Sequence, residues 1–161
     1  MIEAGSLSKA YNGVFALDKV SFAFEEGEII GIIGHNGAGK TTLLKILAGL
    51  VLPTSGTLRV HEIDVIKNPG RIKEMIGYLP EESRLYETMK ADQYLSFFGE
   101  IYGLDAGAIK ERQEALFSAL ALKPDGKKIA EFSKGMKRKL AIARSLIHDP
   151  SILIYDEPTS G

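Results

Sequence analysis

One short segment of the chain combines three glycines with a lysine and a threonine. It reads Gly34, His35, Asn36, Gly37, Ala38, Gly39, Lys40 and Thr41. This is the full pattern G-x-x-x-x-G-K-S/T, whose glycines let backbone N–H groups turn inward around a phosphate. The lysine of such a loop reaches the terminal phosphates of a nucleotide, and the threonine hydroxyl suits Mg²⁺. The alternative is a glycine-rich turn that only joins a strand to a helix.

Two carboxylates follow a second informative segment. Residues 151–155 read Ser-Ile-Leu-Ile-Tyr, and Asp156 and Glu157 come directly after them. A carboxylate at the end of a buried strand beside a phosphate loop can hold Mg²⁺ through water, which is the role predicted for Asp156. Glu157 would face the γ-phosphate and polarise the attacking water as a general base. The alternative is a solvated acidic pair at a strand end.

A strand and a helix are needed to position the phosphate loop. Residues 29–33 are apolar without alternation, which predicts a strand buried on both faces of a parallel sheet. Apolar residues between 40 and 50 follow helical spacing, and Gly49 marks the helix end. This helix contains two lysines and no acid, so a bound anion would complement its N-terminus.

The other elements follow from apolar spacing and turn residues. Aromatic residues at 94, 97, 98 and 102 repeat at helical spacing, for which core packing is the default interpretation and a docking face the alternative. The predicted elements are a hairpin system at 2–7 and 20–24, strands at 57–60, 76–79 and 151–155, a helical insert at 89–122 interrupted near 103–107, and a helix that opens at Ser133 and stops at Asp149.

Composition excludes several classes of protein. The chain has 161 residues, 45% of them hydrophobic and 25% charged, and 20 Lys and Arg balance 21 Asp and Glu. These values are ordinary for a globular domain, and a net charge of −1 argues against attraction of the whole surface to nucleic acid or anionic lipid. The absence of cysteine excludes disulfides and cysteine-bound metals. No apolar run is long enough to span a membrane, and His35, His61 and His148 are too scattered to predict a metal site.

The helix that Ser133 opens begins with an excess of positive charge. Ser133 is a good N-cap, and Lys134, Lys137, Arg138 and Lys139 follow it without an acid. Cations at a helix N-terminus are unfavourable, so an external anion would relieve the helix. The alternative is a basic, solvated helix face.

These segments together resemble a known family, the ATP-binding-cassette (ABC) ATPases. Residues 132–139 resemble the signature segment, and residues 156–161, Asp-Glu-Pro-Thr-Ser-Gly, resemble the end of the Walker B motif and the start of the D-loop. The resemblance covers the whole chain and the motifs come in the family's order. It implies an α/β P-loop NTPase (RecA-like) core, with an N-terminal antiparallel β subdomain and an α-helical subdomain. Residues 1–87 and 148–161 would form the β subdomain and catalytic core, and 88–147 the helical subdomain.

The resemblance also implies roles for single residues. Tyr11 would stack on adenine, with packing in the hairpin as the alternative, and the phosphate loop with Thr42 would hold the phosphates. Ser133 and Gly135 would contact the γ-phosphate of ATP bound to an opposite subunit. The implied catalytic residues are Lys40, Glu81 and Glu157, and the implied metal ligands are Thr41, Glu81 and Asp156.

The chain departs from the family's pattern in two motifs, the signature and the Q-loop. The signature reads Phe-Ser-Lys-Gly-Met instead of the commonest Leu-Ser-Gly-Gly-Gln, a variant similar to that of exporter-type cassettes. Glu81 stands where the family's Q-loop has glutamine, and its carboxylate would add negative charge near the triphosphate.

By this resemblance the expected function is that of an ATP-hydrolysing motor subunit of an export-type ABC transporter. It would use ATP and Mg²⁺, pair with a second nucleotide-binding domain, and bind a transmembrane permease subunit at the cytoplasmic face of the membrane, without direct contact to nucleic acid. The alternative is a soluble ABC ATPase acting on DNA or ribosomes.

Because Gly161 falls inside the segment that resembles the D-loop, the C-terminal core strands of the family are expected to be missing from this chain. One of those strands would lie between the strands at 29–33 and 151–155. A sheet with that gap leaves unpaired backbone groups, so the 161 residues alone are expected to be a poorly stable fragment without ATPase activity.

Overall fold

The computed structural model describes residues 1–157, which form parts of two compact units. The first unit is Met1–Lys73 and the second begins at Glu74. Each unit is described by itself. The division of the chain at 87, 88, 147 and 148 that the family resemblance implies stays a prediction.

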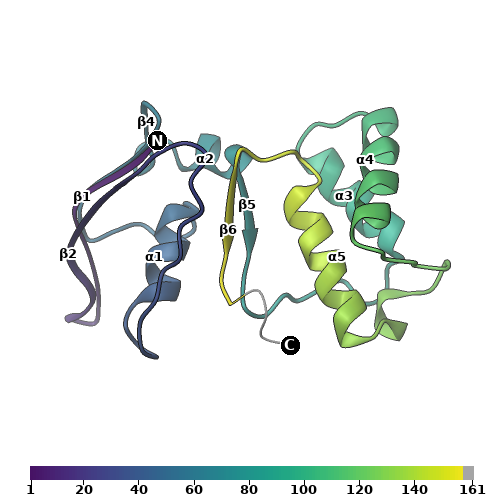
Figure 1. The fold of residues 1–161 in the computed structure, drawn as a ribbon, viewed down its shortest axis with the longest axis horizontal. Helices are drawn as coiled ribbons and strands as arrows, with labels where there is room; N and C mark the ends of the chain where they lie inside the picture. Colours follow the sequence, from purple (N-terminus) through teal and green to yellow (C-terminus); the bar gives the residue numbers. More distant parts are fainter. Residues whose placement is uncertain (158–161) are drawn as a thin grey trace. The chain divides into compact units, whose positions relative to one another are not determined.

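The N-terminal unit is built on a four-stranded antiparallel sheet with the order β2-β1-β3-β4. Figure 1 labels β1, β2 and β4 of this sheet. The predicted hairpin is confirmed, and it is longer than the sequence indicated. Its turn is Asn12-Gly13, with φ angles of +49° and +83°, which match the twist of the paired strands. Tyr11 and Val14 therefore face each other across the turn. The strands are β1 (Ile2–Tyr11), β2 (Val14–Phe24), β3 (Ser55–Val60) and β4 (Ile63–Asp64).

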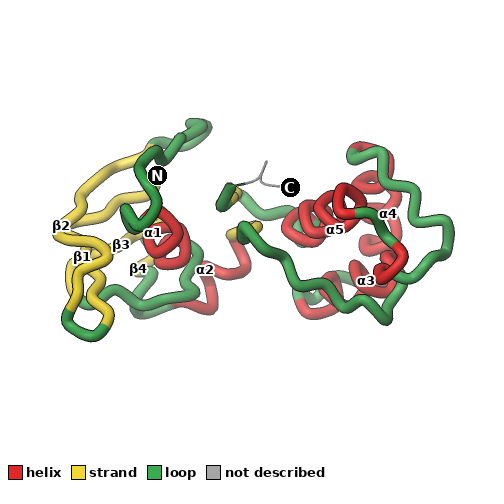
Figure 2. Tube along the Cα trace, turned by 90° about the horizontal axis from the view of Figure 1, so that it is seen from below, coloured by secondary structure: helices red, strands yellow, loops and turns green. Residues whose placement is uncertain are grey.

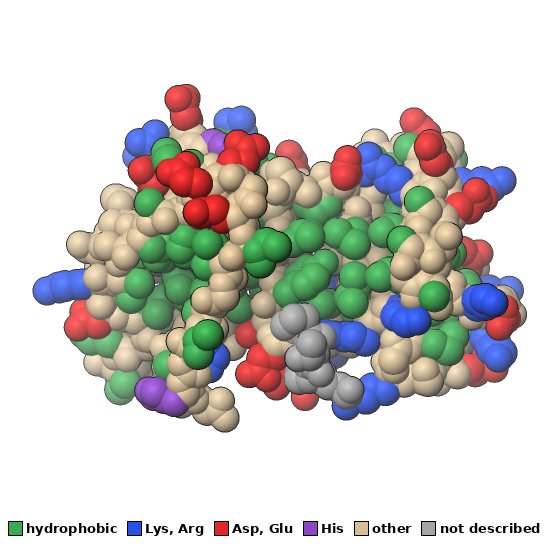
Figure 3. All heavy atoms as spheres, in the orientation of Figure 1, with side chains coloured by type: hydrophobic (Ala, Val, Ile, Leu, Met, Phe, Trp, Pro, Cys, Tyr) green, Lys and Arg blue, Asp and Glu red, His purple; other side chains and the backbone are tan. Residues whose placement is uncertain are grey.

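The prediction of a strand at residues 29–33 is wrong. The segment pairs with no strand among the described residues, and Ile29 and Ile33 are 100% and 97% exposed. Figure 3 shows hydrophobic side chains at the surface of this unit. A strand exists only through its hydrogen-bonded neighbours. The apolar run indicates burial, but it carries no information on which neighbour would provide it.

Helix α1 (Lys40–Leu47) follows the phosphate loop and packs its apolar side on this unit. Leu43, Ile46 and Leu47 are buried. The helix ends earlier than the predicted residue 50 because Gly49 adopts a φ of +66° and the Leu50 amide bonds back to the Lys45 carbonyl at 2.9 Å. Glycine in this conformation is a common helix terminator.

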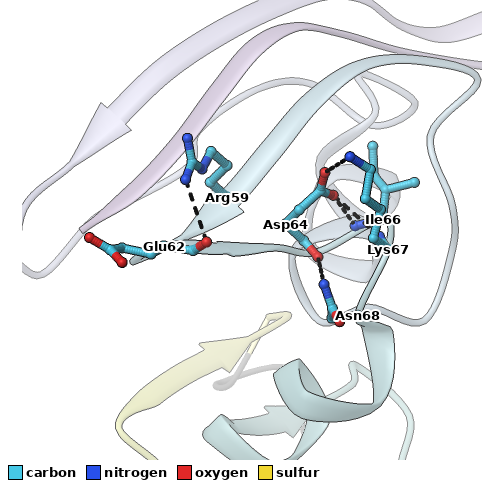
Figure 4. A network of polar contacts seen from close by, with 6 residues as sticks. All are labelled: Arg59, Glu62, Asp64, Ile66, Lys67 and Asn68. Carbon is cyan, nitrogen blue, oxygen red and sulfur yellow. Dashed lines mark hydrogen bonds and ion pairs between the residues drawn. The ribbon is translucent and has the colours of Figure 1, made fainter.

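A polar turn after β4 leads into α2 (Pro69–Met75) (Figure 4). Asp64 Oδ1 accepts hydrogen bonds from the amides of Ile66, at 3.0 Å, and Lys67, at 3.2 Å. The carbonyl of Asp64 also accepts from Asn68 Nδ2 at 3.2 Å. Asp64 therefore shapes the turn from which α2 begins.

The C-terminal unit contains two parallel strands, β5 (Ile76–Leu79) and β6 (Ile152–Tyr155). Both strands were predicted, and the structure confirms them. Helix α5 (Lys134–Leu146) approaches β5 at backbone distance: a Cβ atom on Gly77 would lie 2.3 Å from the Ser145 carbonyl oxygen. Only glycine allows this approach.

The helices of this unit pack together (Figure 2). The predicted helical insert is confirmed, and Gly103, with a φ of +75°, lies in its interruption. Its helices are α3 (Ala91–Ile101) and α4 (Ala106–Ala119), followed by the short 3-10 helix η1 (Ile129–Glu131). The largest side chains of the core shared with α5 are Tyr94, Leu95, Leu122, Ile129, Phe132, Leu140 and Ile147. Within the described residues, no helix has the length and apolar character needed to cross a membrane.

Candidate nucleotide site

The phosphate loop of the N-terminal unit turns through two glycines in the left-handed region. Gly37 has a φ of +82° and Gly39 a φ of +86°. A Cβ atom on Gly39 would lie 2.2 Å from the Ala16 carbonyl oxygen on β2, whereas one on Gly37 would meet nothing within 4 Å. Gly39 is thus required by the packing of the loop on the sheet. Gly37 is required by the turn alone.

Lys40 folds back over the loop that precedes it. Its Nζ donates to the carbonyl oxygens of Gly34, at 2.7 Å, and His35, at 3.1 Å. The Ala38 amide closes a turn onto the His35 carbonyl at 3.1 Å. The ammonium is therefore held at the loop, where an anion can accept a hydrogen bond from it.

The remaining loop residues are open to solvent. His35, Asn36, Gly37 and Ala38 are exposed, and His35 Nδ1 lies 2.8 Å from the Asn36 carbonyl oxygen. Thr41 and Thr42 lie in the first turn of α1, which contains no acid and has no side-chain cap. The helix N-terminus leaves its first amides available to an anion.

Tyr11 ends β1 and is 45% exposed. Lys9 Nζ lies 5.0 Å from the centroid of its ring and donates to the Leu52 carbonyl at 2.9 Å. The exposure of the ring is compatible with stacking on a base, which stays a prediction.

The acidic pair lies in the C-terminal unit, after β6. Asp156 is 3% exposed, and its amide donates to the Leu79 carbonyl at 2.9 Å, which extends the pairing of β5 with β6. Burial raises the pKa of Tyr78, and the Asp156 carboxylate raises it further. The Tyr78 hydroxyl is buried and has no hydrogen-bond partner among the described residues. Glu157 is exposed and has a φ of +44°.

Ser133 caps α5 as predicted, because its Oγ accepts from the Met136 amide at 3.2 Å. Gly135 lies in the first turn, and a Cβ atom there would meet nothing closer than 4.0 Å. The residues that resemble the D-loop start, Pro158 to Gly161, lie outside the described residues.

Three of the four basic residues near the start of α5 have partners in the same unit. Lys137 pairs with Glu87 at 2.6 Å, and Lys139 donates to the Ala121 carbonyl at 3.2 Å. Within residues 1–157, Arg138 donates to the backbone carbonyls of Pro80, Glu81 and Glu157. Contacts within the unit therefore compensate part of the positive charge at the start of α5, and an external anion is not needed for all of it.

Arg138 brings together three residues that the sequence predicted for the site. It joins the Glu81 and Glu157 backbones to the helix that Ser133 caps. The side chain of Glu81 is exposed. Sequence reasoning missed this link, because the basic run around Arg138 does not distinguish a structural arginine from its neighbours.

The metal ligands predicted from the sequence lie in both units: Thr41 in the first, Glu81 and Asp156 in the second. Among residues 1–157 no group of three or more acidic or histidine side chains is positioned to hold a metal ion. The hydroxyl and carboxylate oxygens predicted here are nevertheless the donors that Mg²⁺ prefers.

The predicted set of aromatic residues divides into two parts. Tyr94 is 1% exposed and belongs to the core, whereas Phe97 is 41% exposed. Tyr86, which was not part of the predicted set, is 51% exposed, and its ring lies edge to face with that of Phe97, with 5.9 Å between the ring centroids. The core interpretation is confirmed for Tyr94, and the docking interpretation stays a prediction for Phe97.

Comparison with known proteins identifies the family. Residues 17–160 match the family model described as ABC transporter. The chain is 45% identical over 150 residues to the ABC transporter ATP-binding protein NatA of Bacillus subtilis (strain 168), which covers 92% of this chain and 61% of that protein. It is 39% identical over 162 residues to the linearmycin resistance ATP-binding protein LnrL of the same organism, covering 100% and 52%. The chain thus spans about half to three fifths of these two relatives.

Solved structures agree. An ATP-binding subunit of an ABC transporter matches with a TM-score of 0.88 and 31% identity, over 99% of this chain and 67% of that one. A dimeric bacterial ABC transporter cassette matches with a TM-score of 0.89 and 25% identity, over 99% and 75%. These likenesses confirm the predicted fold class. Because the family model spans most of its length, the chain belongs to the ABC transporter family.

Proposed function

We propose that this chain supplies the ATP-binding and ATP-hydrolysing part of an export-type ABC transporter. The observation that carries the proposal is the phosphate loop, in which Lys40 Nζ is already held at the loop by the Gly34 and His35 carbonyls. The loop has the glycine conformations and the acid-free helix start that binding of a phosphate needs.

Different residues of the chain are assigned to different parts of ATP binding and hydrolysis. Lys40 and the N-terminus of α1 bind the β- and γ-phosphates, and Tyr11 stacks on adenine. The oxygen atoms of Thr41, Glu81 and Asp156 would hold Mg²⁺, and Glu157 would take a proton from the attacking water. The ion, when bound, neutralises charge that develops on the transferred phosphoryl group. Ser133 and Gly135 complete the site of a second cassette, so hydrolysis requires a dimer.

The direction of transport is proposed from the relatives. One relative is named for linearmycin resistance and another, 36% identical and from Ralstonia nicotianae, for Nod factor export. We infer export through a separate transmembrane permease subunit, with the chain at the cytoplasmic face of the membrane and no direct nucleic-acid contact. The exposed Tyr86 and Phe97 are the proposed contact to that subunit. A soluble ABC ATPase acting on DNA or ribosomes would instead show ATP hydrolysis stimulated by those partners.

The test is ATP binding and phosphate release by the protein in which this sequence naturally occurs. Lys40→Ala is expected to abolish binding, because it removes the cation that neutralises the β- and γ-phosphates. The matched control is Lys45→Ala, which removes the same charge from the last turn of the same helix. Unchanged affinity in Lys40→Ala would show that the loop is only a structural turn.

A further inference from the structure

One arginine on α5 donates hydrogen bonds to the backbone of two segments that are distant from each other in sequence. Arg138 Nη1 donates to the carbonyl oxygens of Pro80, at 3.0 Å, and Glu81, at 3.1 Å. Its Nη2 donates to the Glu157 carbonyl at 3.0 Å. The first two acceptors are 58 and 57 residues from Arg138, and the third is 19 residues away. One half-buried guanidinium therefore holds two loops to one helix.

The two loops begin where the pairing of β5 with β6 stops. The ladder ends with Leu79 opposite Tyr155 and one further bond, from the Asp156 amide to the Leu79 carbonyl. Backbone carbonyls beyond the end of a ladder need other partners. Arg138 provides them, because its planar fork presents several N–H donors in fixed directions.

Glu157 has a backbone conformation that needs support. Its φ of +44° lies in the left-handed region, which costs energy for any residue with a side chain. Such conformations persist where the surroundings hold them in place. The carbonyl that Arg138 binds belongs to this residue, so the arginine contacts the strained backbone that carries the carboxylate.

We propose that Arg138 is a positioning residue, which fixes the backbones of Glu81 and Glu157 relative to the helix capped by Ser133. This inference deepens the proposed function and rests on it. Through Arg138, the helix that would contact a partner's nucleotide and the carboxylate that would activate water move as one body. A lysine holds the charge but lacks the planar fork, so it satisfies fewer of the three carbonyls at once.

The experiment compares Arg138→Met and Arg138→Lys with Arg112→Met, in the protein in which this sequence naturally occurs. Arg112 is a matched control, because its half-buried guanidinium also donates to a backbone carbonyl, that of Ile147, at 2.9 Å. The measurements are kcat, the dissociation constant for ATP, the melting temperature, and hydrogen–deuterium exchange of residues 80–82 and 155–157.

Arg138→Met is expected to lower kcat about tenfold or more, as small misplacements of catalytic groups do, and to leave the dissociation constant for ATP within about twofold. Arg138→Lys is expected to retain more of kcat than Arg138→Met. Exchange is expected to rise at residues 80–82 and 155–157 in Arg138→Met. Arg112→Met is expected to lower the melting temperature by a similar amount and to keep kcat.

Equal loss of kcat in Arg112→Met and Arg138→Met would overturn the proposal, since activity would then follow stability alone. Unchanged exchange at residues 80–82 and 155–157 in Arg138→Met would overturn it as well. If the unsubstituted protein did not hydrolyse ATP, the proposed function would fail, and the exchange measurement would still decide whether Arg138 positions the two loops.

Discussion

Replacement of Gly39 by alanine is expected to destabilise the fold by about 2 to 5 kcal/mol, from two separable effects. Gly39 has a φ of +86°, and holding alanine in the left-handed region costs about 1–2 kcal/mol. The new methyl group would also lie 2.2 Å from the Ala16 carbonyl oxygen and 3.0 Å from Leu17 Cδ2. Moving α1 away from β2 to relieve this overlap costs about 1–3 kcal/mol, as overpacking does.

Gly37→Ala isolates the first effect. Gly37 has nearly the same φ, +82°, but its Cβ would meet nothing within 4 Å. The assay is urea unfolding of the protein in which this sequence naturally occurs, followed by circular dichroism, without nucleotide. Gly39→Ala is expected to lose about 1–3 kcal/mol more than Gly37→Ala. Equal losses would refute the reasoning, because they would show that the contact with Ala16 relaxes without cost and that Gly39 serves phosphate binding alone.

Three further predictions concern the acid Glu157, the helix cap Ser133 and the half-buried His148. Glu157→Gln is expected to keep ATP binding, stop turnover and accumulate a dimer with ATP in size-exclusion chromatography; a monomer that hydrolyses ATP normally would contradict the role of Glu157 as the base. Ser133→Arg is expected to keep ATP binding and abolish hydrolysis, while Ser133→Ala loses only the cap, about 1 kcal/mol in urea unfolding; a proportional fall of binding and hydrolysis would make Ser133 a residue of its own chain's site. Burial lowers the pKa of His148 below its usual 6.5, against the hydrogen bond to the Ile76 carbonyl, so the unfolded chain takes up the proton first. The melting temperature should therefore fall as pH decreases below about 6.5, and His148→Gln should remove the part of this pH dependence that comes from His148. A pH dependence that His148→Gln leaves unchanged would contradict this prediction.

The sequence could predict the local conformation of contiguous motifs, while their roles in a site stay predictions. The phosphate loop, the acidic pair after β6 and the Ser133 cap each depend on neighbours in the chain, and local rules describe such neighbours well. The strands β5 and β6 were also predicted, because short apolar runs end at charged or turn residues. The longer hairpin could have been found too, since Asn12-Gly13 is a strong turn signal.

What failed depended on partners distant in sequence. The apolar run at 29–33 indicated a buried strand, and the structure has it unpaired among the described residues and exposed. Arg138 looked like one member of a basic run, and its acceptors are as many as 58 residues away. Charge and hydrophobicity are properties of single residues, whereas a hydrogen-bonded neighbour is a property of the fold.

Arg138 binds the backbone of residue 81 and not its side chain, so the two parts of this residue can have separate roles. The carbonyl of residue 81 is the same in every amino acid, so the arginine can hold this loop whatever side chain the position carries. The side chain of Glu81 is exposed, and the contact with Arg138 does not involve it. An exchange of glutamate for glutamine at position 81 would therefore change the charge of this loop and leave the hydrogen bond from Arg138 to its carbonyl in place.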